Sequence, residues 1–162
     1  MPMVIDTNVL ATANEYADHA SPSCVGNCVR ELRRVHDAEV VAIDDGMRIL
    51  KEYARYASYA GQPGPGDVFF KWLWDNQGNQ DHCLMVSITP RDDDPSNFEE
   101  FPDDPDLAGF DPDDRKWVAV ALVAGPHATI DNAADTDWWD HRQALQRHGI
   151  EINFLCADLM QR

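Results

Sequence analysis

Hydrophobic and polar positions along the chain follow two alternating patterns. Short apolar runs, several of them β-branched, are typical of buried strands, whereas apolar residues spaced three and four apart are typical of amphipathic helices. The runs predict strands over 3–5, 39–43, 83–88, 127–131 and 150–154. The helical spacing predicts helices over 9–13, 22–34, 44–57, 67–74, 117–124 and 136–148.

Local signals mark the ends of several of these elements. Ser21-Pro22 is typical of a helix start, and Asp44-Asp45 and Asp67 are expected to cap the helices that follow them. Gly125-Pro126 and Gly149 are expected to end two others. Strands and helices therefore alternate along the whole chain.

This alternation predicts an α/β fold with three layers, in which helices cover both faces of a central, mainly parallel sheet of about five strands. The 162 residues correspond to a single domain, 1–162. One stretch departs from the pattern. Residues 91–112 are rich in Asp, Glu and Pro, and we expect them to form an acidic loop inserted in the domain.

Composition narrows the classes of function. The chain has 29 Asp and Glu against 13 Lys and Arg, for a net charge of −16. This balance argues against broad attraction to nucleic acid, which depends on Lys and Arg at phosphates, so a phosphate-bearing partner must be met locally. No apolar run approaches the roughly 20 residues of a membrane span, and no leader pattern opens the chain, so we expect a cytoplasmic protein.

The four cysteines, at positions 24, 28, 83 and 156, are few and scattered. We expect free thiols, as in a reducing compartment. Cys24 and Cys28 are one helical turn apart and, with His82-Cys83, raise zinc binding as an alternative. A close second pair of the usual type is absent, which favours thiols buried in the core.

Acidic residues fall where predicted strands give way to helices. These are Asp6, Glu52, Asp114 and Asp135. Ligands of open α/β sheets bind beyond the carboxyl ends of the strands, so the four carboxylates are predicted to converge there. Such a cluster needs a cation, and Mg²⁺ or Mn²⁺ prefers oxygen ligands. Ions of this kind can activate water and stabilise the leaving oxygen in phosphodiester cleavage.

Four segments, in order, also resemble the motifs of the PIN-domain family of metal-dependent ribonucleases. They are Val4-Ile5-Asp6-Thr7-Asn8-Val9-Leu10, Ile49-Leu50-Lys51-Glu52-Tyr53, Asp114-Arg115-Lys116-Trp117-Val118-Ala119 and Ile130-Asp131-Asn132-Ala133-Ala134-Asp135-Thr136-Asp137-Trp138. The resemblance covers nearly the whole chain. It implies a metal held by Asp6, Glu52, Asp114 and Asp135, with Asn8 as a polar neighbour of the first acid.

Two of these positions leave a choice open. Asp111 and Asp113 lie close to Asp114, and Asp131 and Asp137 lie close to Asp135. Asp114 has the better spacing to the following helix, and Asp137 adjoins Trp138, so Asp114 and Asp135 are preferred, with Asp111 and Asp137 as substitute ligands. Considered one at a time, Asp114 and Asp135 could equally be helix caps, and Glu52 could be a solvated helix residue, without any metal.

Positive charge near these acids supplies a candidate substrate surface. Arg48, Lys51 and Arg55 repeat at helical spacing around Glu52, and Arg115 and Lys116 follow Asp114. They are candidates for holding an RNA backbone, although a solvated face balancing acidic neighbours explains them equally well.

The combined interpretation is a Mg²⁺- or Mn²⁺-dependent endoribonuclease that uses a metal-activated water. Because the family includes toxins of toxin–antitoxin pairs and many dimers, the resemblance also raises an antitoxin or regulatory partner and a homodimer. Two alternatives stay open. One is a catalytically inactive PIN-like module that binds protein through the acidic loop, and the other is a structure-specific DNA nuclease.

Overall fold

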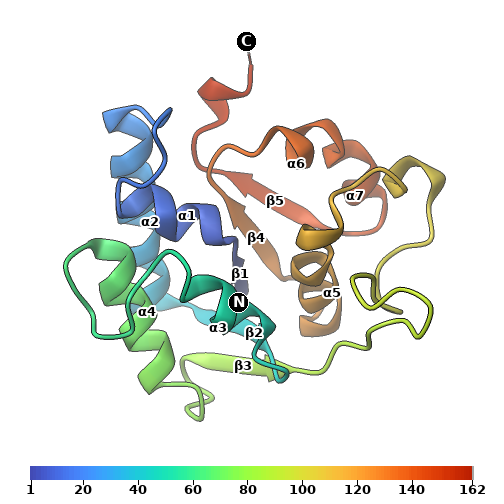
Figure 1. Cartoon of the computed structure of the whole chain (residues 1–162), viewed down its shortest axis with the longest axis horizontal. Coiled ribbons are helices and arrows are strands. Elements are labelled where there is room, and N and C mark those ends of the chain that lie inside the picture. The colour runs from blue at the N-terminus through green and yellow to red at the C-terminus, as the bar shows by residue number, and fades with distance from the viewer. Residues whose placement is uncertain (162) are drawn as a thin grey trace.

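The computed structural model describes residues 1–161 and contains one sheet of five parallel strands in the order β3-β2-β1-β4-β5 (Figure 1). The first strand is therefore the central one, and Met3 is in register with Val41 on one side and with Thr129 on the other. The α/β class and the parallel sheet predicted from the sequence are confirmed. The strands are β1 (Pro2–Ile5), β2 (Val40–Asp44), β3 (Cys83–Val86), β4 (Thr129–Asn132) and β5 (Glu151–Phe154).

Helices cover both faces of this sheet, as the alternation predicted. In Figure 1, α1 (Thr7–Ala13), α2 (Pro22–Ala38) and α4 (Pro65–Asp75) gather on one side. On the other side α5 (Arg115–Ala124) crosses β1 and β2, with α6 (Thr136–Asp140) and α7 (Arg142–Arg147) beyond it. The short α3 (Arg48–Tyr53) follows β2 and contacts both α1 and α5.

The prediction of a helix over 44–57 is wrong in length, because a turn separates the end of β2 from the start of α3. Met47 takes a left-handed conformation, with φ of 65°, and α3 starts only at Arg48. The Asp44 carboxylate accepts hydrogen bonds from the backbone N–H groups of Arg48 (3.1 Å) and Ile49 (2.9 Å), so it does cap the helix from four residues away.

Two other boundaries also differ from the sequence prediction. The segment 136–148 is two helices, since the chain bends at His141 between α6 and α7. Asp67 is not the cap of α4. Gly64 occupies that position, and the buried Asp67 carboxylate instead accepts from the N–H groups of Gly64 (2.7 Å) and Ser58 (2.6 Å), which fixes the loop before the helix.

The acidic segment 91–112 is irregular, as predicted, but it is part of the core. It contributes four buried side chains, Phe98, Phe101, Leu107 and Phe110. Its outer surface is tied to α7 through Asp104, which contacts Arg147 at 3.2 Å and His148 at 2.8 Å. Two short turns, η1 (Pro105–Leu107) and η2 (Pro112–Asp114), lead from this segment into α5.

The expectation of four free thiols is wrong. Cys24, in the first turn of α2, forms a disulfide with Cys156, which follows β5, whereas Cys28 and Cys83 are free and buried. The two bonded positions are 132 residues apart, so only the tertiary fold brings them together. Within residues 1–161, every helix is too short or too polar to cross a membrane.

Candidate metal centre

The predicted acids come together where parallel strands end. Asp6 directly follows β1, Asp135 follows β4, and Glu52 lies on α3 after β2. Asp114 closes η2 at the start of α5, the helix that crosses the sheet beside them. Four segments that are far apart in the chain thus present carboxyl groups at one edge of the sheet.

Asp6 is the most buried of the four, with only 5% of its surface exposed. It caps α1, since its Oδ1 accepts from the N–H of Asn8 at 3.0 Å, and its Oδ2 accepts from the Asn132 amide at 3.1 Å. Burial raises the pKa of Asp6 to about 7; the Asn8 hydrogen bond opposes this, and the charges of Glu52 and Asp135 add to it.

Asp114 and Asp135 share this unfavourable environment. Burial, reinforced by the charges of Asp6, Asp135 and Asp111, raises the pKa of Asp114 to about 8. The pKa of Asp135 is also raised, mainly by burial and also by Asp137 and Asp111, while hydrogen bonds from backbone N–H groups oppose the change. The pKa values of Asp6 and Asp114 are thus raised in part by other acids of the cluster, and that of Asp135 by the adjacent Asp137 and Asp111.

Glu52 is held by two partners that were not predicted from the sequence. Its Oε2 accepts a hydrogen bond from the Thr7 hydroxyl, and its Oε1 pairs with the Lys116 ammonium at 2.7 Å. Lys116 also donates to the backbone carbonyl of Asp113, and its charge lowers the pKa of Asp6 and Asp114. Lys116, predicted as a phosphate contact, thus serves in this structure as the internal counter-charge of the acids.

The neighbouring polar residues brace the cluster. Asn8 accepts from the N–H of Ala133 at 3.0 Å and so joins α1 to the end of β4. Asp137 accepts from the N–H of Asp111 at 2.9 Å, which ties α6 to η2. Asn132, which the sequence analysis did not assign to the site, orients Asp6; its place directly after Ile130-Asp131 gave no local signal for that role.

Asp131, one of the alternatives to Asp135, belongs to a different environment. It is fully buried, accepts from the Asn153 amide at 3.0 Å, and lies beside Glu31 of α2. Burial and Glu31 together raise the pKa of Asp131 to about 8, whereas the hydrogen bonds from Arg34 lower the pKa of Glu31. Because strand residues alternate in direction, the side chains of Asp131 and Asn132 face opposite sides of the sheet, and of these two side chains only that of Asn132 hydrogen-bonds to Asp6.

The carboxylates are gathered but not drawn tightly together. Among residues 1–161, the sole group of three Asp, Glu, His or Cys side chains with ligand atoms inside a mutual 4.8 Å consists of Cys24, Cys28 and Cys156. For all four carboxylates to bind one cation, some of their oxygens would therefore have to lie closer together than they do here. Their chemistry fits a hard divalent ion, because such an ion would offset the repulsion that now raises their pKa values.

Basic side chains rim the cluster on the Glu52 side. A hollow of about 460 Å³ is lined by Arg48, Lys51, Glu52, Arg55 and Lys116, together with Phe98 and Pro112. The guanidinium of Arg48 is partly committed to Asp44, at 3.2 Å.

Arg115 lies outside this surface. It donates to the carbonyls of Phe110 (3.0 Å) and Ala108 (3.1 Å), and its guanidinium carbon lies 4.8 Å from the centre of the Phe101 ring. Arg115 therefore anchors the acidic segment, and the structure provides no role for it at a substrate.

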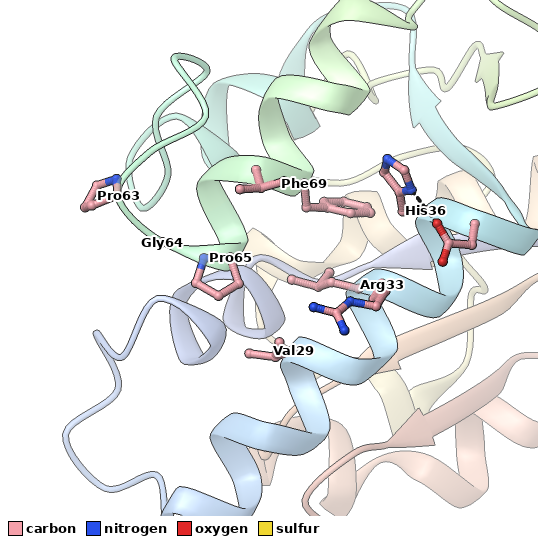
Figure 2. Close-up of a pocket in the computed structure, with 10 residues that line it drawn as sticks. Val29, Arg33, His36, Pro63, Gly64, Pro65 and Phe69 are labelled. Atoms are coloured by element: carbon pink, nitrogen blue, oxygen red, sulfur yellow. Dashed lines mark hydrogen bonds and ion pairs between the residues drawn. The ribbon is translucent and has the colours of Figure 1, made fainter.

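Two further hollows differ in their relation to the site. One of about 440 Å³ is lined by Asn8 and Asp135, among other residues. The other, of about 530 Å³, lies between α2 and α4, with Val29, Arg33 and Phe69 in its lining (Figure 2). None of the four acids lines the second hollow, so its size gives it no part in their chemistry.

The site thus combines carboxyl groups with raised pKa values and a neighbouring hollow lined by basic side chains. Comparisons with known proteins add no relative, since no family model, curated protein or solved structure matches the chain.

Proposed function

We propose that this protein is a PIN-like, metal-dependent endonuclease that cleaves RNA. Asp6, Glu52, Asp114 and Asp135 would hold Mg²⁺ or Mn²⁺ at the carboxyl ends of the strands. The observation that carries the proposal is the accumulation of acids whose pKa values are raised by burial and, at Asp6 and Asp114, also by the charges of other members of the cluster. A fold bears this cost where function requires it.

The cost is local and specific. Folding places Asp6, Asp114 and Asp135 where their ionised forms repel, and Lys116 supplies one positive charge, through its contact with Glu52. A divalent cation would favour ionised carboxylates and, when bound, would supply Lewis-acid stabilisation of phosphate oxygens and a more acidic water.

The chain's own residues have distinct tasks in this proposal. Asn8 and Asn132 fix both oxygens of Asp6, so that its carboxylate is oriented in advance. Thr7 and Lys116 fix Glu52 in the same way. Such orientation reduces the reorganisation needed during reaction.

Substrate contact is assigned to the basic hollow. Lys51 and Arg55 are exposed beside Glu52 and would bind phosphates of the backbone, while the rest of the strongly acidic surface repels nucleic acid. The preference for RNA over DNA rests on the resemblance to the PIN-domain family.

Cleavage of matched RNA and DNA tests the proposal. A mixed-sequence single-stranded RNA and its DNA counterpart would be incubated at low salt with wild type, with Asp6→Asn and with Asp93→Asn, in Mg²⁺, in Mn²⁺ and in EDTA. Asp93 is an exposed residue of the acidic segment, so its variant carries the same change of charge away from the site.

We expect metal-dependent cleavage of RNA by wild type and Asp93→Asn and none by Asp6→Asn. Cleavage of DNA alone would favour the alternative of a DNA nuclease. Cleavage that is equal in Asp6→Asn would exclude this site, and a folded wild type that binds metal at neither Asp6 nor Glu52 would favour the inactive binding module instead.

A further inference from the structure

The three cysteines near the start of α2 form a cluster that the proposed nuclease does not use. Their sulfur atoms all lie within 4.8 Å of one another, and all three side chains are buried. Cys24 and Cys156 are joined as a disulfide, while Cys28, one helical turn after Cys24, keeps a free thiol.

The spacing of the sulfurs suits a single soft metal ion. Three thiolates around zinc at about 2.3 Å place their sulfurs roughly 3.8 Å apart in tetrahedral geometry, inside the 4.8 Å limit that these side chains already meet. The cysteines come from α2 and from the segment after β5, and a second contact joins these two parts, because Asn27 of α2 donates to the carbonyl of Leu155 at 2.9 Å. Reduction would therefore leave the three thiols near one another.

One feature of the surroundings favours a thiolate at Cys24. Cys24 lies in the first turn of the 17-residue helix α2, where the positive end of the helix dipole stabilises a thiolate. The hollow of about 440 Å³ beside Asn8 also reaches Cys24 and His19, and it provides an entry path with room for a fourth ligand such as water.

We propose that reduction of the Cys24–Cys156 disulfide opens a three-thiolate site, completed by Cys28, for one thiophilic metal ion such as Zn²⁺. The oxidised protein lacks this site because two of the three sulfurs are bonded to each other. The protein thus has two exclusive states of one cluster, a disulfide and a metal thiolate.

The change of state requires a named reductant. A phosphine and one water molecule convert the disulfide to two thiols and a phosphine oxide, and binding of the ion to three thiolates then releases three protons. Burial raises the pKa of Cys28 to about 12, so uptake of the metal becomes stronger as the pH rises.

Cobalt provides the direct test, because a thiolate bonded to Co²⁺ gives a sulfur-to-metal charge-transfer band that carboxylate ligands do not give. Full-length protein would be reduced with a phosphine, freed of it without air, and titrated with Co²⁺ and then Zn²⁺. All variants would carry Asp6→Asn, so that ions held by the carboxylates do not confuse the stoichiometry.

Cys28→Ser and Cys83→Ser form a matched pair, since both replace a free, buried cysteine and only Cys28 belongs to the cluster. We expect the band at one equivalent in the reduced parent and in reduced Cys83→Ser, its displacement by Zn²⁺, and its absence from reduced Cys28→Ser and from every oxidised protein.

Two results would overturn the proposal. One is a reduced parent protein that gives no thiolate–cobalt band, whether it stays folded or not. The other is an equally strong band in Cys28→Ser. Neither result bears on the nuclease, which is assayed separately by RNA cleavage with an intact Asp6.

Discussion

Replacing Asp6 by asparagine should make the metal-free protein more stable above neutral pH while abolishing the proposed activity. An unfolded aspartate ionises near pH 3.9, whereas burial raises the pKa of Asp6 in the folded protein to about 7. The folded state therefore holds a proton that the unfolded state has already lost, and stability falls as the pH rises from about 4 to about 7.

The difference between the pKa values of Asp6 in the unfolded and folded states sets the size of this destabilisation. The range from 3.8 to about 7 corresponds to roughly 4 kcal/mol at about 1.4 kcal/mol per pH unit. Asparagine retains the acceptor for the Asn8 N–H, but its amide cannot accept from Asn132, which costs about 1–3 kcal/mol. A net gain of about 1–3 kcal/mol remains, or a rise in Tm of roughly 2–12 °C for a chain of this size.

Thermal unfolding of wild type, Asp6→Asn and the exposed control Asp93→Asn in EDTA at pH 8.5 and pH 5 measures this difference. At pH 5 the wild-type carboxyl is protonated, so the advantage of Asp6→Asn should vanish or reverse. Added Mg²⁺ should stabilise wild type more than Asp6→Asn. An Asp6→Asn protein that is no more stable than wild type at pH 8.5, or whose difference is the same at both pH values, would refute the reasoning.

Three other predictions concern the rim, the insertion and the disulfide. In the Asp6→Asn background, Lys51→Ala should weaken RNA binding and reduce the slope of log K against log salt by about 0.7, as measured by fluorescence anisotropy at several salt concentrations; an unchanged slope would remove Lys51 from the contact surface. Phe110→Ala should lower the free energy of unfolding in urea by about 3–5 kcal/mol, because this fully buried ring packs against Trp138, whereas a loss below about 1 kcal/mol would show that the insertion is peripheral. Reduction of the Cys24–Cys156 bond in EDTA should cost about 3–5 kcal/mol in the same assay, since the bond closes a long loop, and no loss would contradict its stabilising role.

The sequence predicted the parts of this fold that depend on local patterns. The runs around Val4, Val41 and Ile130 identified three strands because a buried parallel strand is apolar on both faces. The break between α6 and α7 at His141 was not predictable in this way, because apolar spacing continues through both helices.

In the candidate site, too, some features follow from local sequence patterns and others depend on tertiary contacts. Asp6 and Asp135 could be named because each comes shortly after a predicted strand. The pairing of Glu52 with Lys116 joins residues 64 positions apart, and the Cys24–Cys156 bond spans 132, so both depend on how the helices come to lie on the sheet. Contacts of this range leave no periodicity in the sequence.

The central position of β1 has a consequence for the newly made chain. β1 is synthesised first, but its partner β4 follows about 126 residues later, as the register of Met3 with Thr129 shows. At about 5–20 residues per second, this separation corresponds to roughly 6–25 s of translation. Asn132 and Asp135 are not yet present during this time, so the proposed metal centre around Asp6 cannot assemble until synthesis has passed Asp135.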